Sequence, residues 1–205
     1  MAMELEIKKL TPQNLNDFLT FFETDAHADN PQEDRCYCVC WSAEDHTAPV
    51  DLSSPQARRA LAVQYVQRGT LQGYLAYAQG RVVGWCNANT KADCQKCSSW
   101  LRFRCDVLPD APGVRTKSVF CFTVAPAYRR CGVASQLLQR VCADAAAEGF
   151  DYAEAYPNCR FTSVFHDFVG PLSMYEKQGF VPTEKTKTLF VVRKPLKNGQ
   201  AGSVG

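Results

Sequence analysis

The chain has 205 residues, 46% of them hydrophobic, and its 23 Lys and Arg residues against 21 Asp and Glu residues give a net charge of +2. This length and hydrophobic content suit one domain with a substantial core, and the near balance of charge provides no overall field for nucleic acid or an anionic membrane. No stretch of about 18 consecutive apolar residues occurs, and the N-terminus lacks a basic segment followed by an apolar one, so we expect a cytoplasmic protein without a membrane span.

The cysteine count is high for such a protein. Eleven cysteines are present, and an odd number argues against a fully paired disulfide framework. Several of them lie inside apolar runs, where a cysteine acts as a small buried hydrophobic residue. We therefore expect mostly reduced thiols.

The first third of the chain predicts one strand and two helices. Residues 4–10 alternate apolar and polar side chains, which indicates a strand, and a helix follows over 11–23 with Thr11 as N-cap. Residues 24–54 are irregular and polar and predict a long loop. A second helix begins after the N-cap Ser54 and ends at Gly69.

The middle of the chain predicts a sheet. Residues 71–89 read as two strands joined at Gly80, whereas residues 90–114 show no sustained period and predict an irregular excursion with at most a short helix. Residues 117–125 form a strongly apolar run that is typical of a strand buried on both faces. A helix with one apolar face follows from about residue 133 to 148.

The last third predicts a strand over 150–156, a short helix that ends at Gly179, and a final strand pair over 180–196. This order of elements predicts a single α/β domain with a mixed sheet, spanning residues 1–195. We expect the tail, residues 196–205, to be disordered.

The junction between the apolar strand and its helix carries the strongest functional signal. The run "FTVAPAYRRCGVASQLL", residues 122–138, places a glycine and two arginines directly before a helix. The first backbone N–H groups of a helix have no partner inside the helix and bind anions, and the glycine lets a ligand approach the backbone. The pattern is typical of a phosphate-binding turn.

This run, together with "YPNC" after the next strand and "MYEKQGFV" near the C-terminus, resembles the GNAT superfamily of N-acetyltransferases. The fixed positions of the superfamily signature are matched by Arg129, Gly132 and Ala134. The resemblance implies a GNAT-like acyl-CoA N-acyltransferase fold with a mixed, mostly antiparallel sheet. It also implies acetyl-CoA as cosubstrate and transfer of its acetyl group to a primary amine.

The resemblance also implies where the cosubstrate binds. In this family the fourth and fifth strands splay apart, and the pantetheine arm fills the gap between them. Backbone groups at Phe122, Thr123 and Val124 would contact the arm, and Asn158 is a further candidate. The diphosphate would lie on the turn and the helix start, formed by Arg129, Arg130, Cys131, Gly132, Val133, Ala134 and Ser135.

The chemistry of acetyl transfer asks for an acid and a route for the proton of the amine. In this family a tyrosine on the helix after the fifth strand often protonates the leaving thiolate, and "MYEKQGF" places Tyr175 there, where it also contacts the cofactor. Glu154 and His166 are the candidate bases. Transfer of the proton through water would make a dedicated base unnecessary.

Two alternatives from other functional classes remain at this point. The chain could be a non-catalytic acyl-CoA-binding or sensing protein that keeps the phosphate-binding turn. It could also be a thiol or zinc module, because "CQKC" has the spacing of a metal knuckle. Its ligands would come from Cys36, Cys38, Cys40, Cys94 and Cys97, but only one half of that set has good spacing, so we expect no metal.

The acceptor would lie between residues 24–54, 90–114 and 157–172. These segments carry aromatic residues and cysteines but no strongly acidic lining, which a polycationic partner would require. The sequence therefore favours a small-molecule amine over a protein tail, and no nucleic-acid or membrane partner.

Overall fold

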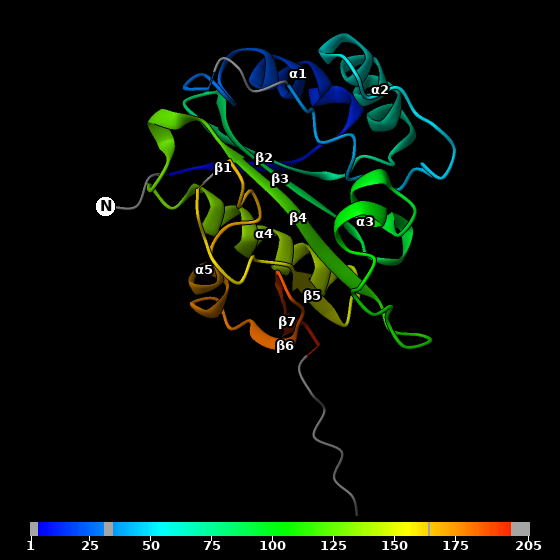
Figure 1. The fold of residues 1–205 in the computed structure, drawn as a ribbon. Helices are drawn as coiled ribbons and strands as arrows, with labels where there is room; N and C mark the ends of the chain where they lie inside the picture. Colours follow the sequence, from blue (N-terminus) through cyan, green and yellow to red (C-terminus); the bar gives the residue numbers. More distant parts are fainter. Residues whose placement is uncertain (1–3, 31–34, 164, 198–205) are drawn as a thin grey trace, which may run out of the picture.

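A single seven-stranded sheet forms the centre of the molecule (Figure 1). The computed structural model describes residues 4–30, 35–163 and 165–197. The strand order is β1-β2-β3-β4-β5-β7-β6, and within the described residues β4 and β5 are the only parallel neighbours. The strands are β1 (Glu6–Lys9), β2 (Gly73–Ala78), β3 (Arg81–Thr90), β4 (Thr116–Val124), β5 (Tyr152–Ala155), β6 (Val181–Lys185) and β7 (Phe190–Pro195).

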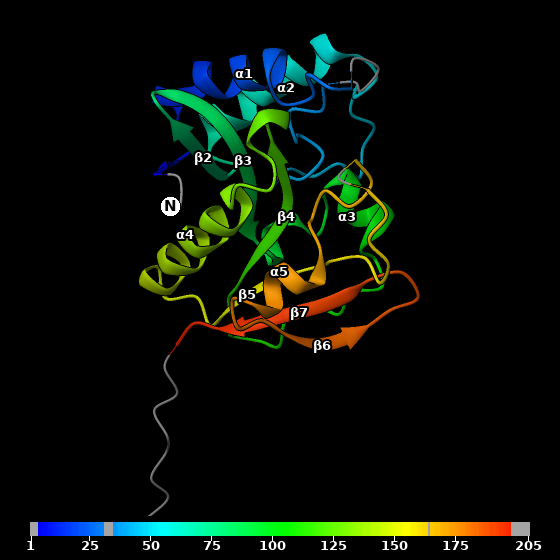
Figure 2. The same ribbon diagram turned by 90° about the vertical axis from the view of Figure 1, so that its left-hand side faces the viewer.

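Helices cover both faces of the sheet. Figures 1 and 2 show α1 and α2 together on one face, with α4 on the opposite face. The short α3 lies beside β4, and α5 lies near β5 and β7. The helices are α1 (Leu15–Thr24), α2 (Pro55–Arg68), α3 (Ser98–Phe103), α4 (Val133–Ala147) and α5 (Leu172–Glu176). Three short 3-10 turns are η1 (Pro12–Asn14), η2 (Ala92–Cys94) and η3 (Pro126–Tyr128).

Local signals in the sequence explain most of these boundaries. The Ser54 side chain accepts a hydrogen bond from the backbone N–H of Ala57 at 3.1 Å, and Gly69 ends α2 with a left-handed φ of 72°. The helix expected over 11–23 begins instead as the 3-10 turn η1, and α1 follows it. The excursion over 90–114 contains η2 and α3. The tail expected from residue 196 lies, after Leu196 and Lys197, outside the described residues.

The two central strands β4 and β5 separate along their length. They pair from Thr116 opposite Tyr152 to Val119 opposite Ala155, and β4 then continues to Val124 with no partner from β5. We call the space beside residues 120–124 of β4 the β4–β5 gap.

A β-bulge in β4 accompanies this separation. Neighbouring residues of β3, Asn87 and Ala88, pair with Cys121 and Val119, which leaves Phe120 as an extra residue. Val119 and Phe122 pack in the apolar cluster under α4, whereas Phe120 and Cys121 pack in clusters on the other face. The bulge therefore turns two consecutive side chains toward the face that α1, α2 and α3 cover.

Candidate active site

The turn before α4 has the geometry of an anion site. Gly132 is the N-cap of α4 with a left-handed φ of 82°, and a Cβ added there would meet no atom within 4 Å. The first described bond of the helix runs from the N–H of Gln136 to the carbonyl of Gly132 at 3.0 Å. The N–H groups of residues 133–135 therefore point out of the helix into open space, which fits a diphosphate.

The two arginines of this turn have different surroundings. Arg129 Nε donates to the carbonyl of Val124 at 3.2 Å, and its guanidinium forms an ion pair with Asp29 that lowers the pKa of that carboxyl. Arg130 has a left-handed φ of 64° and an exposed side chain, and the neighbouring Cys131 is exposed as well. Arg130 is thus the arginine that presents its charge to solvent beside the helix N-terminus.

The register of β4 decides which backbone groups face the β4–β5 gap. Peptide groups along a strand point alternately to its two neighbours. The N–H of Ala125 bonds the carbonyl of Val83 in β3 at 3.0 Å, so the peptide groups of Thr123 also face β3. Those of Phe122 and Val124 face the gap. Thr123 presents to ligands only its side chain, which lies 3.8 Å from the thiol of Cys121.

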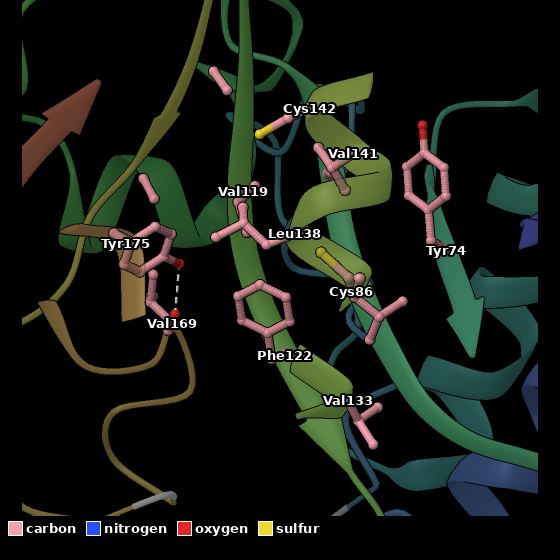
Figure 3. Close-up of a cluster of buried hydrophobic side chains, with 14 of the residues drawn as sticks. Tyr74, Cys86, Val119, Phe122, Val133, Leu138, Val141, Cys142, Val169 and Tyr175 are labelled. Carbon is pink, nitrogen blue, oxygen red and sulfur yellow. Dashed lines mark hydrogen bonds between the residues drawn. The ribbon is translucent and has the colours of Figure 1, made fainter. Parts of the chain in front are cut away.

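A short stretch of the chain lies inside the gap, and we call it the gap segment, residues 167–170. The carbonyl of Phe168 accepts a hydrogen bond from the N–H of Phe122 at 2.7 Å. The carbonyl of the next residue, Val169, accepts a hydrogen bond from the hydroxyl of Tyr175 at 2.6 Å (Figure 3). Two consecutive carbonyls thus contact two of the groups that the family resemblance assigns to the cosubstrate.

The gap segment is fixed by its own side chains. The carboxylate of Asp167 accepts hydrogen bonds from the backbone N–H of Thr162 and Ser163 and from the amide of Asn158. Burial raises the pKa of Asp167, but these hydrogen bonds outweigh it and lower the pKa below its usual value. The ring of Phe168 packs against all three apolar clusters of the domain. The amide of Asn158, the candidate contact of the pantetheine arm, is the group that donates to Asp167.

Tyr175 lies on α5 and is completely buried. Its ring contacts the edge of Phe180 at a centroid distance of 5.3 Å. Burial raises the pKa of Tyr175 well above its usual value, so the hydroxyl keeps its proton at neutral pH. The group is therefore a proton donor, and in this structure it donates to Val169.

The two candidate bases lie in different surroundings. Glu154 is fully buried and accepts hydrogen bonds from Tyr156 at 2.7 Å, from Lys91 at 2.8 Å and from Arg193. It lies where β4 and β5 are still paired, opposite Ser118. His166 is exposed, next to the gap segment. The contacts of Glu154 are those of a structural ion network, which Asp110 completes through Lys91 and Arg193.

An aromatic cluster on the other side of β4 was not singled out from the sequence. Trp41 stacks on Phe120 at a centroid distance of 4.9 Å, and Trp100 contacts Tyr156 edge-on at 5.8 Å. The guanidinium of Arg104 lies over the rings of Trp41 and Tyr156. Trp41, Trp100 and Arg104 come from the irregular segments 24–54 and 90–114, whose aromatic content is the one signal of the cluster in the sequence, whereas Phe120 lies on β4 and Tyr156 follows β5.

The five cysteines that are candidate metal ligands divide between two apolar clusters. Cys36 and Cys38 pack with Cys121, whereas Cys40, Cys94 and Cys97 pack with Trp41 and Trp100. Over residues 4–30, 35–163 and 165–197, no group of three or more His, Cys, Asp or Glu side chains is arranged to hold a metal ion. The zinc alternative has no ligand set among these residues.

Comparison with protein families identifies the class of enzyme that the fold and the turn before α4 define. The family model of the acetyltransferase (GNAT) domain matches residues 70–182, more than half of the chain. The chain belongs to the GNAT family of acetyltransferases, and its acyl donor is acetyl-CoA. No curated protein matches the chain significantly.

Solved structures show the same fold at low sequence identity. An N-acetyltransferase from Staphylococcus aureus Mu50 aligns with a TM-score of 0.53 and 17% identity, covering 95% of this chain and 99% of that one. The PaiA N-acetyltransferase from Thermoplasma acidophilum, in complex with coenzyme A, aligns with a TM-score of 0.52 and 14% identity over 94% and 99%. The ribosomal-protein-S18-alanine N-acetyltransferase from Escherichia coli gives a TM-score of 0.52 and 12% identity over 97% and 98%.

Across the described parts of the chain, each helix is too short or too polar to cross a membrane.

Proposed function

We propose that this enzyme acetylates the primary amine of a small molecule. One observation carries the choice of a small acceptor. Residues 36–41 and α3 cover the face of β4 opposite α4: Trp41 stacks on Phe120, and Trp100 of α3 contacts Phe120 and Tyr156 edge-on. A closed aromatic roof suits a small acceptor better than an extended peptide, which needs an open groove.

In this proposal the cosubstrate is bound mainly by backbone groups. The N–H groups at the start of α4 and the charge of Arg130 hold the diphosphate, and the gap-facing peptide groups of Phe122 and Val124 pair with the amides of the pantetheine arm. Cys131 and Gly132 line the same turn. The thioester supplies an activated acetyl carbonyl and a thiolate leaving group.

Tyr175 gives its proton to the departing thiolate. Its high pKa keeps the hydroxyl protonated until a strongly basic sulfur forms beside it. Glu154 already accepts hydrogen bonds from Tyr156, Lys91 and Arg193, so we propose that the proton of the amine leaves through water, past the exposed His166 next to the gap segment.

The gap segment must withdraw before the cosubstrate binds in this way. The N–H of Phe122 and the hydroxyl of Tyr175 each make a hydrogen bond to it, at 2.7 and 2.6 Å, and neither donor can serve two acceptors well. The enzyme would therefore exchange internal hydrogen bonds for equivalent ones to its cosubstrate.

A panel of acceptors tests the proposed function. Purified enzyme is incubated with acetyl-CoA and with small primary amines, a peptide with a free N-terminus, or a lysine-containing peptide, and free thiol is measured. We expect thiol release with one or more small amines and little with the peptides. Efficient turnover of a peptide and none of any small amine would overturn the choice of a small acceptor. Binding of coenzyme A without any turnover would favour an acyl-CoA sensor.

A further inference from the structure

A buried arginine without an acidic partner lies in the aromatic cluster. Arg104 directly follows α3 and is only 6% exposed. Its Nη1 donates to the carbonyl of Phe103 at 2.8 Å, and its Nε is buried without a hydrogen-bond partner. No carboxylate of the described residues forms an ion pair with Arg104, although Asp106 is close enough to raise its pKa slightly against the larger effect of burial.

A buried guanidinium without an anion lowers the stability of the fold unless a ligand supplies the negative charge. Removing a charge from water is unfavourable, and proteins normally pair a buried guanidinium with a carboxylate. Burial lowers the pKa of Arg104, but the usual value is so high that the group stays charged at neutral pH. The remaining buried ion network of this region, around Glu154, is by contrast fully paired.

The surroundings of Arg104 restrict the partner that it can take. Its guanidinium carbon lies 5.5 Å from the ring centroid of Trp41 and 5.3 Å from that of Tyr156. Ring faces favour the cation but accept no strong hydrogen bond from it. Its N–H groups lie in the guanidinium plane, and the partner that best matches a planar row of donors is a carboxylate with two oxygens.

The position of Arg104 relates this partner to the reaction. Tyr156 follows β5 at the edge where β4 and β5 separate. The charge of Arg104 also lies close enough to Tyr175 to lower its pKa slightly, against the larger effect of burial. Arg104 thus contacts a residue at the start of the β4–β5 gap, and the candidate acid Tyr175 hydrogen-bonds the segment that lies in this gap.

We propose that Arg104 binds the carboxylate of the acetyl acceptor, and that the acceptor is a free amino acid acetylated on its α-amino group. The inference rests on the proposed function and names its substrate class. The amine nitrogen forms a bond to the acetyl carbon, and the bond from that carbon to sulfur breaks. Sulfur takes the proton of Tyr175, the amine proton goes to water, a proton from water restores the hydroxyl of Tyr175, and the products are an N-acetyl amino acid and coenzyme A.

Matched acceptors test the carboxylate directly. After a screen of the common amino acids, the best one is compared with its carboxamide and its decarboxylated amine, which keep the amino group and lack the anion. We expect kcat/KM for the amino acid to exceed both by about 10²-fold or more, because a buried arginine left without its anion penalises the other two.

Variants of Arg104 separate binding from folding. Arg104→Met keeps an unbranched apolar stem and removes the charge; we expect an increase in KM of about 10²-fold with a smaller change in kcat, and an unchanged or higher melting temperature. Arg104→Lys keeps the charge without the planar row of donors, so its KM should lie between those of the wild type and Arg104→Met. Arg81→Met, at an exposed arginine that begins β3, serves as the control with wild-type kinetics.

Four outcomes decide between the inference and the proposed function. Equal turnover of the amino acid, its amide and its amine would overturn the inference and leave the small-amine activity intact. Turnover of peptides alone would overturn the proposed function. Melting temperatures test the site without any turnover. An increase with the amino acid plus coenzyme A, which the amide does not cause and Arg104→Met does not show, supports the site. No increase with any amino acid contradicts the inference.

Discussion

The backbone N–H of Phe122 donates a hydrogen bond of 2.7 Å to the carbonyl of Phe168, across the gap that opens where β4 leaves β5. The next carbonyl, that of Val169, accepts a hydrogen bond from Tyr175. An extended ligand with two amides would use the same donors. The gap segment therefore competes with the pantetheine arm for the polar groups of the gap, and its release is part of the cost of binding.

The first prediction concerns the anchor of that segment. Phe168→Ala removes a ring that packs against all three apolar clusters, so the gap segment should be released at a lower cost. If the cost falls by about 1.4 kcal/mol, which is part of the burial energy of the ring, the affinity for coenzyme A becomes about tenfold tighter. Calorimetry measures the affinity. Phe161→Ala, at an exposed phenylalanine of the same loop, is the control. Weaker or equal binding by the Phe168 variant would show that the segment does not compete.

The second prediction concerns the turn before α4. Gly132→Val should abolish coenzyme A binding, because the residue has a φ of 82° and its Cβ would occupy the open space in front of the helix. Gly113→Val is the matched control, since Gly113 has a φ of 83° and the same open surroundings on a loop before β4. We expect a similar loss of melting temperature in both variants and a loss of affinity in the first alone. Normal affinity in a folded Gly132 variant would move the diphosphate site elsewhere.

The third prediction uses two exposed thiols of one protein. Cys131 lies in the turn before α4, and Cys105 lies after α3. Coenzyme A should protect Cys131 from alkylation because the diphosphate covers it, while Cys105 should react at the same rate with and without ligand. Mass-mapped labelling of both sites checks this, and equal labelling of Cys131 in the two states would argue against a diphosphate at this turn.

The fourth prediction concerns the candidate acid. Tyr175→Phe keeps the buried ring and removes the hydroxyl, so kcat should fall by about 10²- to 10⁴-fold, the usual effect of a general acid. Affinity for coenzyme A should change little. The loss of the hydrogen bond to Val169 should cost about 1 kcal/mol of stability. A variant with wild-type kcat would make Tyr175 a residue of the core, with water or another donor protonating the thiolate.

The fifth prediction is a pH dependence of stability that arises from His46. The backbone N–H of Ser98 donates to Nδ1 of His46 at 3.1 Å, so Nε2 carries the proton and faces the hydroxyl of Tyr65 at 3.1 Å. Burial lowers the pKa of His46 against the opposing charges of Glu44 and Asp45. As the pH falls, the unfolded chain therefore binds a proton at this histidine at a higher pH than the folded chain does.

Stability should accordingly decrease as the pH falls below about 6.5, the pKa of an unperturbed histidine, and level off below the pKa of the folded state. Melting temperatures between pH 7 and pH 5 measure this effect. In His46→Asn the amide oxygen replaces Nδ1 as acceptor and no proton binds, so the decrease should be smaller. His166→Asn, at an exposed histidine, should follow the wild type. An equal decrease in His46→Asn and wild type would assign the effect to other groups.

Local signals made the turn before α4 and the boundaries of α2 predictable, because Ser54, Gly69 and Gly132 act on their own neighbours in the chain. The surroundings of Arg104 and Glu154 were not predictable in this way. Trp41 and Tyr156 cover Arg104 from positions far from it in the chain, and Glu154 is reached by Lys91, directly after β3, and by Arg193 of β7. A polar side chain shows in the sequence its charge but not its partners, which only the tertiary fold decides.

The insertion of β7 between β5 and β6 has a consequence for synthesis of the protein on the ribosome. Before residues 190–195 emerge, β5 has an unpaired edge and Glu154 lacks the guanidinium of Arg193. An open edge with a half-paired buried carboxylate is prone to pair with strands of other chains. The nascent domain therefore depends on its last strand to close the sheet, so a premature stop codon within β7 should produce aggregated protein rather than a shortened enzyme.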